Sequence, residues 1–374
     1  MKKYMELYRE MRQDIVEGRY GFSERLPSKR YLSEERGISL ITVEHALALL
    51  EEEGYIEGKE RSGYFVSYQE GDVFPVSNKE EEAGFIDYFK RKTAVSKEQM
   101  SYPTIAKAVR RAMSKYQEEI LEASEMQGKY FLRRALKEYL RRGRGIFVEE
   151  EQMILGAGAE NLYALLAQIL GEEKRFAVES PSYDKMQRIY ESHGIQLELL
   201  PMGKNGIESA ALQKAKAKVL HVTPFHSYPT GITADASKRR EYLDFAHRNG
   251  AVIIEDDYDS EFSPLGKPED CLFSMEAGEN VFYMNSFSKT IGPAFRMAYL
   301  LLPKKNLKEN LEKISFYSCS VPVLEQCILT ELLESGEFER HINRVRRSRR
   351  IRKKSREEEE RSNQEDCKIK MTKV

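Results

Sequence analysis

Tryptophan is absent from the sequence, and its four cysteines include no C-x-x-C pair. So few cysteines exclude a disulfide-stapled miniprotein and give no sign of a metal site, and they predict reduced thiols in a cytoplasmic protein. No stretch approaches the ~18 consecutive apolar residues of a membrane-spanning helix. Charged residues interrupt the first turns too often for a signal peptide. We therefore expect no metal, no membrane partner and no secretion.

An excess of charge of either sign is also missing. Lysine and arginine total 60 and aspartate and glutamate total 61, so the formal net charge is −1. No global field therefore indicates a nucleic-acid or membrane partner, and such a partner has to be sought locally. What is present, 374 residues with 41% hydrophobic and 32% charged side chains, is typical of a globular protein of two or three domains.

The first 68 residues have the pattern of three helices and a hairpin. Apolar residues recur at helical spacing over residues 4–17. Ser28 is a natural N-cap for a second helix that Gly37 ends, and a third helix starts at Ser39 or Thr42 and ends at Gly54. Two helices joined by a tight glycine turn are a helix-turn-helix.

The segment YIEGKERSGYFVS after the third helix alternates polar and apolar residues, which predicts a two-stranded wing. Residues 1–68 are therefore expected to form a winged helix that binds DNA through helix starts and wing. The predicted DNA contacts are Ser28, Lys29, Arg30, Ser39, Thr42, His45, Lys59 and Arg61.

A polar, acidic stretch at 69–100 is interpreted as a linker, and the pattern changes again over residues 101–338. There, helical segments alternate with short apolar runs, which predicts an α/β domain with a mainly parallel sheet. The expected strands are MILGA, FAVES, LELL, KVLHVTP, AVIIEDD, VFYMNSFS and AYLLLP. Ligands of such sheets bind outside the carboxyl ends of the strands.

Two expected strands end in residues that carry chemistry: Asp256, Asp257 and Tyr258 after one, Ser286, Ser288 and Lys289 after the other, with Arg296 following. A protein that holds an aldehyde cofactor needs a lysine amine to form a Schiff base. It also needs a carboxylate to keep a pyridine nitrogen protonated, and donors for a phosphate. These residues supply all three.

Two further segments add weaker signals. Backbone N–H groups around Gly158 and Ala159, in a glycine-rich turn before a helix, are suited to a phosphate, and Tyr183 is suited to stacking on a ring. Simpler readings stay open from the residues alone. Lys289 is one lysine among many, either Asp256 or its neighbour caps the following turn, and the tyrosines serve equally as core or rim residues.

The ordered segments GAGAE, ESPSY, TPFHSYPTG, EDDYDSEF and SFSKTIGPAFRMAYL, behind LPSKRYLSEERGIS and LLEEEGYIEG, resemble the MocR-type regulators of the GntR family. These regulators join a winged helix to a fold-type I, aminotransferase-like domain that binds pyridoxal 5'-phosphate. The resemblance implies operator DNA, a small amine or amino-acid effector and a homodimer as partners.

The resemblance also implies roles for single residues. Lys289 is the internal aldimine lysine, and Asp256 is the partner of the pyridine nitrogen. Tyr258 bonds the phenolic oxygen, and Tyr183 stacks on the ring. The residues expected around the phosphate are Ser286, Ser288 and Arg296, together with the backbone at Gly158 and Ala159.

Three departures from the family pattern stand out. Ala159 and Glu160 replace a hydroxyl residue and a glutamine in the phosphate turn, which should weaken cofactor binding unless Glu160 points away. Leu40 and Glu44 replace arginines in the recognition region, and residues 1–70 carry a net charge of −3. An acidic residue on a groove-facing helix repels phosphate.

The third departure is the end of the chain. Residues 340–374 carry 14 lysines and arginines against 6 acidic residues, a composition that predicts no packed core. We interpret 339–374 as a charged tail, a remnant of or substitute for the family's small carboxyl-terminal domain, and expect a truncated or divergent end.

Three functions compete at this stage. The first is a transcription regulator that senses pyridoxal phosphate or an amino compound through aldimine chemistry at Lys289, without net turnover. The second is a pyridoxal phosphate-dependent aminotransferase whose N-terminal domain serves dimerisation; its carboxylate clamp is missing. The third is a winged helix on a scaffold that binds no cofactor.

Overall fold

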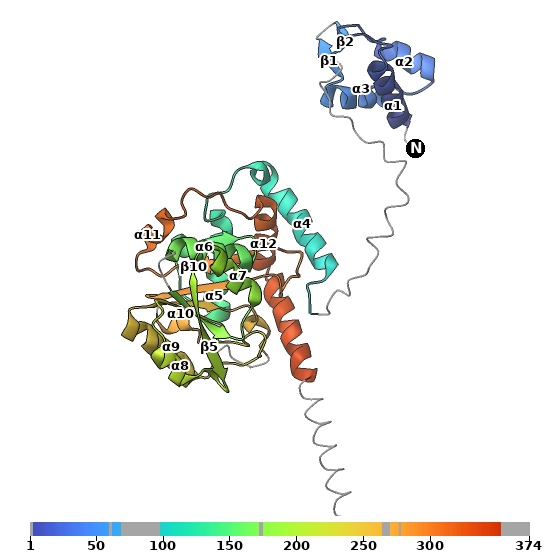
Figure 1. Cartoon of the computed structure of the whole chain (residues 1–374). Helices are drawn as coiled ribbons and strands as arrows, with labels where there is room; N and C mark the ends of the chain where they lie inside the picture. Colours follow the sequence, from blue (N-terminus) through green and yellow to red (C-terminus); the bar gives the residue numbers. More distant parts are fainter. Residues whose placement is uncertain are drawn as a thin grey trace, which may run out of the picture. The chain divides into compact units, whose positions relative to one another are not determined.

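The computed structural model describes residues 3–59, 62–68, 98–171, 175–263, 270–276 and 278–352. The chain divides between residues 93 and 94 into two compact units, which are described separately. Figure 1 shows a small helical unit with a hairpin and a larger unit with a central sheet. Residues 69–97 of the predicted linker and Arg61 lie outside the described residues.

The N-terminal unit is the predicted winged helix. Its elements are α1 (Lys3–Val16), α2 (Lys29–Arg36), α3 (Leu40–Glu52) and the antiparallel strands β1 (Ile56–Lys59) and β2 (Gly63–Val66). The hydroxyl of Ser28 accepts a hydrogen bond from the N–H of Tyr31, and Ser39 accepts one from Thr42. Both hydroxyls satisfy N–H groups that the first turn leaves free, so the predicted helix starts are confirmed.

Apolar residues at helical spacing hold this unit together. Leu7, Met11 and Ile15 of α1 are buried against a core that includes Leu47 and Leu50 of α3. Gly37 ends α2 at φ +60°, a left-handed conformation that glycine adopts without strain. The tight turn sets α2 against α3, as a helix-turn-helix requires.

The larger unit has an eight-stranded sheet in the order β3-β10-β9-β8-β7-β4-β5-β6. Neighbours among β4, β5, β7, β8 and β9 run parallel, while β10 is antiparallel to both β3 and β9, and β6 to β5. The strands are β3 (Met153–Gly156), β4 (Arg175–Ser180), β5 (Gln196–Gly203), β6 (Gly206–Ile207), β7 (Val219–Val222), β8 (Val252–Asp256), β9 (Val281–Ser286) and β10 (Ala298–Leu301). All seven predicted strands are present.

Helices cover both faces of this sheet (Figure 1). They are α4 (Tyr102–Tyr116), α5 (Tyr130–Arg144), α6 (Ala159–Leu170), α7 (Asp184–Ser192), α8 (Ser209–Lys214), α9 (Ala236–Asn249), α10 (Leu272–Met275), α11 (Leu307–Glu312) and α12 (Val323–Glu334). Successive strand residues alternate between two cores. Ile253 faces the core that contains α5, α9 and α12, whereas Ile254 faces the one that contains α6 and α7. A strand that is buried on both faces needs apolar residues at successive positions, which explains the continuous apolar runs in the sequence.

A helix over residues 337–352 follows α12, so packed structure continues past the predicted start of the charged tail at 339. Phe338, Ile342 and Val345 of this helix are buried in the main core. These three apolar residues are spaced four and three apart, which places them on one helix face. Their signal is hidden in the composition because charged and polar residues fill the positions between them and arginines follow. Residues 353–374 lie outside the described part.

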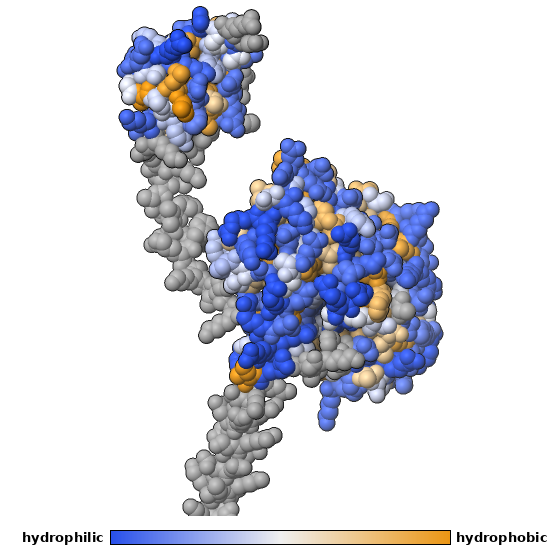
Figure 2. Space-filling model, turned by 180° about the vertical axis from the view of Figure 1, so that it is seen from behind, coloured by the Kyte–Doolittle hydropathy of each residue, from blue (hydrophilic) through white to orange (hydrophobic). Residues whose placement is uncertain are grey.

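Charged side chains dominate the outer surface of the larger unit. On the face seen in Figure 2 its surface is mostly hydrophilic, with hydrophobic residues scattered among charged ones. Within the described residues, no helix is both long enough and apolar enough to cross a membrane.

Candidate functional site

A cavity of about 250 Å³ lies beside the carboxyl ends of β4, β7, β8 and β9. In parallel strands these ends meet at one edge of the sheet, where ligands bind. Several predicted cofactor residues line the cavity: Ala159, Tyr183, Asp256, Tyr258, Ser286, Ser288 and Arg296. Glu160, which the sequence marked as a departure in the phosphate turn, lines it as well. Residues that sequence reasoning did not single out complete the lining: Tyr163, Glu179, Ser182, Met186, His221, Thr223 and Tyr228.

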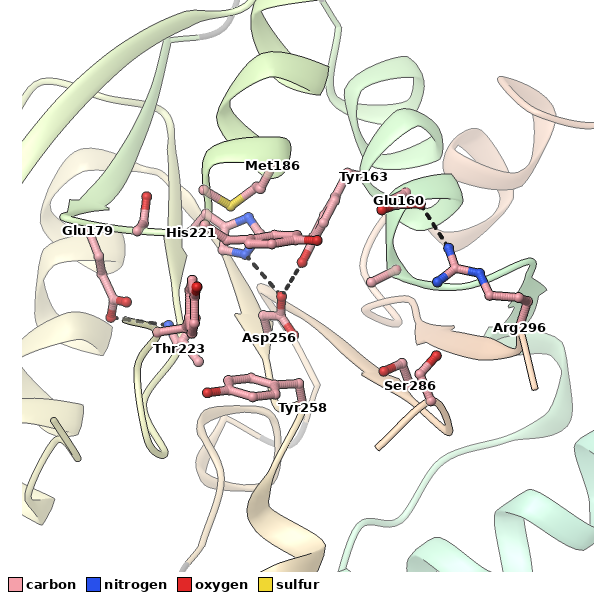
Figure 3. Close-up of a pocket in the computed structure, with 15 residues that line it drawn as sticks. Glu160, Tyr163, Glu179, Met186, His221, Thr223, Asp256, Tyr258, Ser286 and Arg296 are labelled. Atoms are coloured by element: carbon pink, nitrogen blue, oxygen red, sulfur yellow. Dashed lines mark hydrogen bonds and ion pairs between the residues drawn. The ribbon is translucent and has the colours of Figure 1, made fainter. Parts of the chain in front are cut away.

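Asp256 is the central carboxylate of this cavity. It ends β8 and is 7% exposed, and its Oδ2 accepts a hydrogen bond of 2.6 Å from the hydroxyl of Tyr163. The same oxygen lies 3.8 Å from Nε2 of His221, a buried ring nitrogen without a hydrogen-bond partner. Figure 3 shows Asp256 pointing toward both side chains. A carboxylate held in this way is suited to pair with a ring N–H⁺ of a ligand.

Two tyrosines that the sequence predicted as cofactor contacts lie at the cavity. The hydroxyl of Tyr258 donates a 2.8 Å hydrogen bond to the backbone carbonyl of His226, so it is already engaged. Burial, followed by the nearby Asp259, raises the pKa of Tyr258 to about 12, so it stays a neutral donor. Tyr183 precedes α7 and packs edge-on against Tyr228, with ring centroids 5.9 Å apart.

The opposite end of the cavity carries the groups expected for a phosphate. Gly158 precedes α6 at φ +87°, and a Cβ added there would lie 2.7 Å from Nη2 of Arg296. Glu160 does not point away, because its Oε2 is 2.8 Å from that same Nη2 and its Oε1 is 2.8 Å from Nζ of Lys185 (Figure 3). The hydrogen bond from Lys185 and the charge of Arg296 lower the pKa of Glu160.

Lys289 is near the cavity but not in its lining. Its Nζ forms an ion pair of 2.9 Å with Oδ1 of Asp259 and lies 4.6 Å from the centre of the Tyr258 ring. Asp259 also contacts His226, whose Nδ1 is 2.7 Å from Oδ2. The amine is therefore held beside the ring of Tyr258, a residue that lines the cavity together with Asp256.

Glu179 is a buried carboxyl on the far wall of the cavity. It accepts hydrogen bonds from the N–H of Thr223 and the hydroxyl of Ser227. Burial raises its pKa to about 7, because the low-dielectric interior penalises the charged form. A group that changes charge near neutral pH therefore borders the site.

The two aspartates after β8 have different roles. Asp257 faces away from the cavity and forms a buried ion pair of 2.5 Å with Arg144, while the hydroxyl of Tyr283 donates to it. Asp256 therefore faces the cavity, whereas its neighbour Asp257 pairs with Arg144 in the interior. Tyr163 and His221 lie within a helix and a strand, where spacing alone gives no signal of their convergence on Asp256.

The predicted DNA contacts that the structure describes all lie at least partly exposed on the winged helix. Ser28, Arg30, Ser39, His45 and Lys59 are exposed, while Lys29 and Thr42 are partly exposed.

Glu44 of α3 lies 3.2 Å from Nζ of Lys29, and this hydrogen bond raises the pKa of that lysine. A glutamate thus pairs with a cation that was expected to contact phosphate.

Two protein families match the chain. Residues 3–66 match the bacterial regulatory proteins of the gntR family, and residues 91–364 match aminotransferase class I and II. The chain is 32% identical over 353 residues to YdeL, an uncharacterised HTH-type transcriptional regulator of Bacillus subtilis. That match covers 92% of this chain and 76% of YdeL.

The names of two further relatives state what they regulate. The pyridoxine biosynthesis regulator PdxR of Corynebacterium glutamicum is 29% identical, over 93% of this chain and 76% of PdxR. The probable rhizopine catabolism regulatory protein MocR of Rhizobium meliloti is 27% identical, over 92% of this chain and 74% of MocR.

Solved aminotransferases share the fold of the larger unit. An archaeal alanine:glyoxylate aminotransferase superposes with a TM-score of 0.61 at 21% identity, over 66% of this chain. LysN, an α-aminoadipate aminotransferase of Thermus thermophilus, gives 0.61 at 25% identity over 68% of this chain. The chain spans 63% and 65% of the lengths of these two proteins. With a gntR-type winged helix followed by an aminotransferase-like domain, the chain belongs to the MocR-type regulators of the GntR family.

Proposed function

We propose that this regulator binds pyridoxal 5'-phosphate in the cavity at the strand ends and responds there to a small amine or amino acid. The observation that carries the proposal is the convergence of Asp256, Lys289 and Arg296 from three chain segments around one cavity. When bound, the cofactor supplies an aldehyde that condenses with amines and a pyridine ring that withdraws electrons.

The residues present fit this group. Asp256 would hold the proton of the pyridine nitrogen, because Tyr163 already donates to one of its oxygens and fixes its orientation. The unpartnered Nε2 of His221 faces the same oxygen at 3.8 Å, so a polar group is buried there without a partner of its own.

The phosphate would lie at the N-terminus of α6. Ser286, Ser288 and Arg296 border this end, and the glycine at 158 lets the backbone approach the guanidinium closely. Glu160 competes for Arg296, so the phosphate has to displace a carboxylate before it can pair with that arginine. We expect a functional but weakened phosphate subsite.

Lys289 would capture the aldehyde carbon through its amine. In the resting protein Asp259 holds this amine as an ammonium partner, so the lysine must lose a proton and leave Asp259 before it reacts. An amino compound that later takes the aldehyde would return the amine to Asp259. Effector binding is thereby tied to the position of Lys289.

The winged helix would carry the output by binding operator DNA, as a homodimer in the bacterial cytoplasm. Exposed side chains at the starts of α2 and α3, Ser28 and Ser39 among them, support contact with the phosphate backbone. Catalytic turnover is not required for this role. Release and capture at Lys289 suffice to define two states.

Absorbance spectroscopy of the purified full chain tests the cofactor. A visible band that forms with pyridoxal 5'-phosphate, shifts on addition of amino acids and disappears in Lys289→Ala is the expected result. Tyr102→Ala, a change at a residue that is 83% exposed, serves as the control. A colourless protein that takes up no cofactor would refute this part of the proposal.

A gel shift with the DNA that flanks the chain's own gene tests the output. We expect sequence-specific binding that changes when an effective amine is added. Absence of specific binding even at low salt argues against regulation by this chain. Steady transamination abolished by Lys289→Ala would replace the regulatory proposal with the aminotransferase alternative.

A further inference from the structure

Asp259, which the sequence did not single out, is a meeting point of three side chains from three segments. The carboxylate is 4% exposed. Lys289 lies 2.9 Å from Oδ1, His226 lies 2.7 Å from Oδ2, and Nη1 of Arg349 lies 3.6 Å from Oδ1. Two cations, the Lys289 ammonium and the Arg349 guanidinium, therefore share one carboxylate oxygen.

Arg349 comes from the helix over residues 337–352, the last described part of the chain, drawn in red in Figure 1. Hydrogen bonds fix this helix against both segments that carry the ion pair, the one with Lys289 and the one with Asp259. Nε2 of His341 lies 2.8 Å from the carbonyl of Thr290, the residue after Lys289. Arg346 donates to the carbonyl of Glu261, two residues after Asp259. The guanidinium of Arg349 is thus held close to Asp259 by packing on either side.

The same guanidinium has a second carboxylate partner. Nη2 of Arg349 donates to Oε2 of Glu98 at 2.7 Å, and Nη2 of Arg352 donates to Oε1 at 2.7 Å. The hydrogen bond from Arg349 lowers the pKa of Glu98, so this carboxylate stays charged. Glu98 is the first described residue after the stretch that follows the winged helix in sequence.

We infer that Arg349 is a positioning residue for Lys289, acting through Asp259, and that it couples the amine to the segment entering the α/β unit at Glu98. Both cations attract Asp259, so a guanidinium nearby reduces the net attraction that this carboxylate exerts on the ammonium. Once the amine is neutral and bonded elsewhere, Arg349 pairs mainly with Asp259, and its interaction with Glu98 weakens. The coupling is reciprocal, because any pull on Glu98 changes the release of Lys289. The inference uses the proposed function only in taking Lys289 as the reactive amine.

Several ionisable groups surround Asp259. They are Tyr258 on its own segment, His226 in the turn before α9, Lys289 in the loop after β9 and Arg349 in the last helix, with Glu98 behind Arg349. Removing the charge of Arg349 leaves Lys289 and His226 as the donors that face Asp259. The ammonium is then held more tightly, and the free amine forms only at higher pH.

Competitive acetylation of the full chain with acetic anhydride, read by mass spectrometry of the Lys289 peptide, measures this hold without any cofactor. We expect Arg349→Gln to move the midpoint of the labelling-against-pH curve to higher pH, because Asp259 then holds the Lys289 ammonium without a competing guanidinium. Arg349→Lys keeps the positive charge and should therefore leave the midpoint close to that of the unaltered chain. Glu98→Gln frees Arg349 for Asp259 and moves the midpoint down. Arg352 also contacts Glu98, but its side chain is 56% exposed. Arg352→Gln should therefore move the midpoint far less than Arg349→Gln.

The opposite signs of the Arg349 and Glu98 variants are the decisive result, because general destabilisation would not reverse between them. A midpoint in Arg349→Gln equal to that of the unaltered chain would overturn the inference. Equal shifts in Arg349→Gln and Arg352→Gln would also overturn it, because they would show that Asp259 is not the route. Failure of the proposed function is separate, since it appears as absent cofactor uptake while the labelling curves still report on Lys289.

Discussion

The winged helix and the α/β unit handle charge in different ways. Within the described residues, every charged side chain that is buried belongs to the α/β unit, including Glu179, Glu255 and Glu261. Both units nevertheless share one feature. Glu44 pairs with Lys29 in the first and Glu160 pairs with Arg296 in the second, so a glutamate holds a cation that was expected to meet a phosphate. The two pairs are similarly exposed, at 36% and 45% for Lys29 and Glu44 and 47% and 36% for Arg296 and Glu160, but only the second pair lines a cavity.

This difference teaches where a charge matters most. An exposed ion pair is screened by water and salt and contributes little. Both pairs are exposed enough for this screening to apply, so the larger effect at Glu160 is expected only because a ligand in the cavity would compete directly for Arg296. The same substitution of glutamate by glutamine is therefore expected to have unequal effects in the two units.

The largest expected effect comes from the buried carboxyls. The pKa of Glu179 is raised by burial from 4.5 to about 7. Between these pH values the unfolded chain has lost a proton that the folded chain keeps, so the free energy of unfolding falls as the pH rises through this window. Glu179 alone contributes on the order of 3 kcal/mol to the decrease. Glu255, whose pKa burial also raises to about 7, adds to it in the same direction.

Urea unfolding followed by hydrogen exchange, with peptides from each unit read separately, checks this difference. The α/β unit should lose stability between about pH 4.5 and 7, and Glu179→Gln should reduce the slope. The winged helix should change little over that range. Equal slopes in both units would break the comparison.

Gly158→Ala has the next largest effect. An added Cβ meets the guanidinium of Arg296 at 2.7 Å, at a backbone φ of +87°. Displacing Arg296 would remove the charge-assisted hydrogen bond proposed for the phosphate, so affinity for pyridoxal 5'-phosphate should fall about tenfold or more. Absorbance titration measures it.

Gly171→Ala is the matched control, since Gly171 has φ +80° with nothing within 4 Å of an added Cβ. This variant should lose stability but keep cofactor affinity. A similar loss of affinity in both variants would mean that strain, and not the contact with Arg296, is responsible.

Glu160→Gln tests the carboxylate in the cavity. Without its charge Arg296 is free for the phosphate, and affinity for the cofactor should rise about fivefold, the equivalent of about 1 kcal/mol. The measurement is the same titration. Glu191→Gln removes the same charge from the exposed surface of α7 and should leave the affinity unchanged. A weaker affinity in Glu160→Gln would show that Glu160 orients Arg296 instead of competing for it.

The smallest effect is expected at Glu44→Gln. Removing this carboxylate releases Lys29 and takes a negative charge from α3, so DNA binding should tighten about two- to threefold at low salt. Gel shifts at several salt concentrations check it. Glu10→Gln, which removes one of the two carboxylate partners of Arg36 on the same unit, is the control. Equal tightening in both would assign the change to net charge alone.

The sequence predicted the fold to a large extent. The caps Ser28 and Ser39 and the strand ends at Asp256 and Ser286 lie where the patterns placed them. These features are local, because a cap or a strand end depends on residues within a few positions. For the same reason the buried face of residues 337–352 went unrecognised, since three apolar residues among many arginines give too weak a periodicity.

The sequence by itself thus determined the two units, the order of their elements and the residues that end each strand. Only the tertiary structure decided which side chains meet: Tyr163 and His221 at Asp256, Glu160 at Arg296, and Arg349 with Lys289 at Asp259. The physical reason is distance along the chain. Interactions between residues about 90 to 140 positions apart, such as those of Tyr163 and Glu160, depend on how the helices pack on the two faces of the sheet, and no local pattern records that packing.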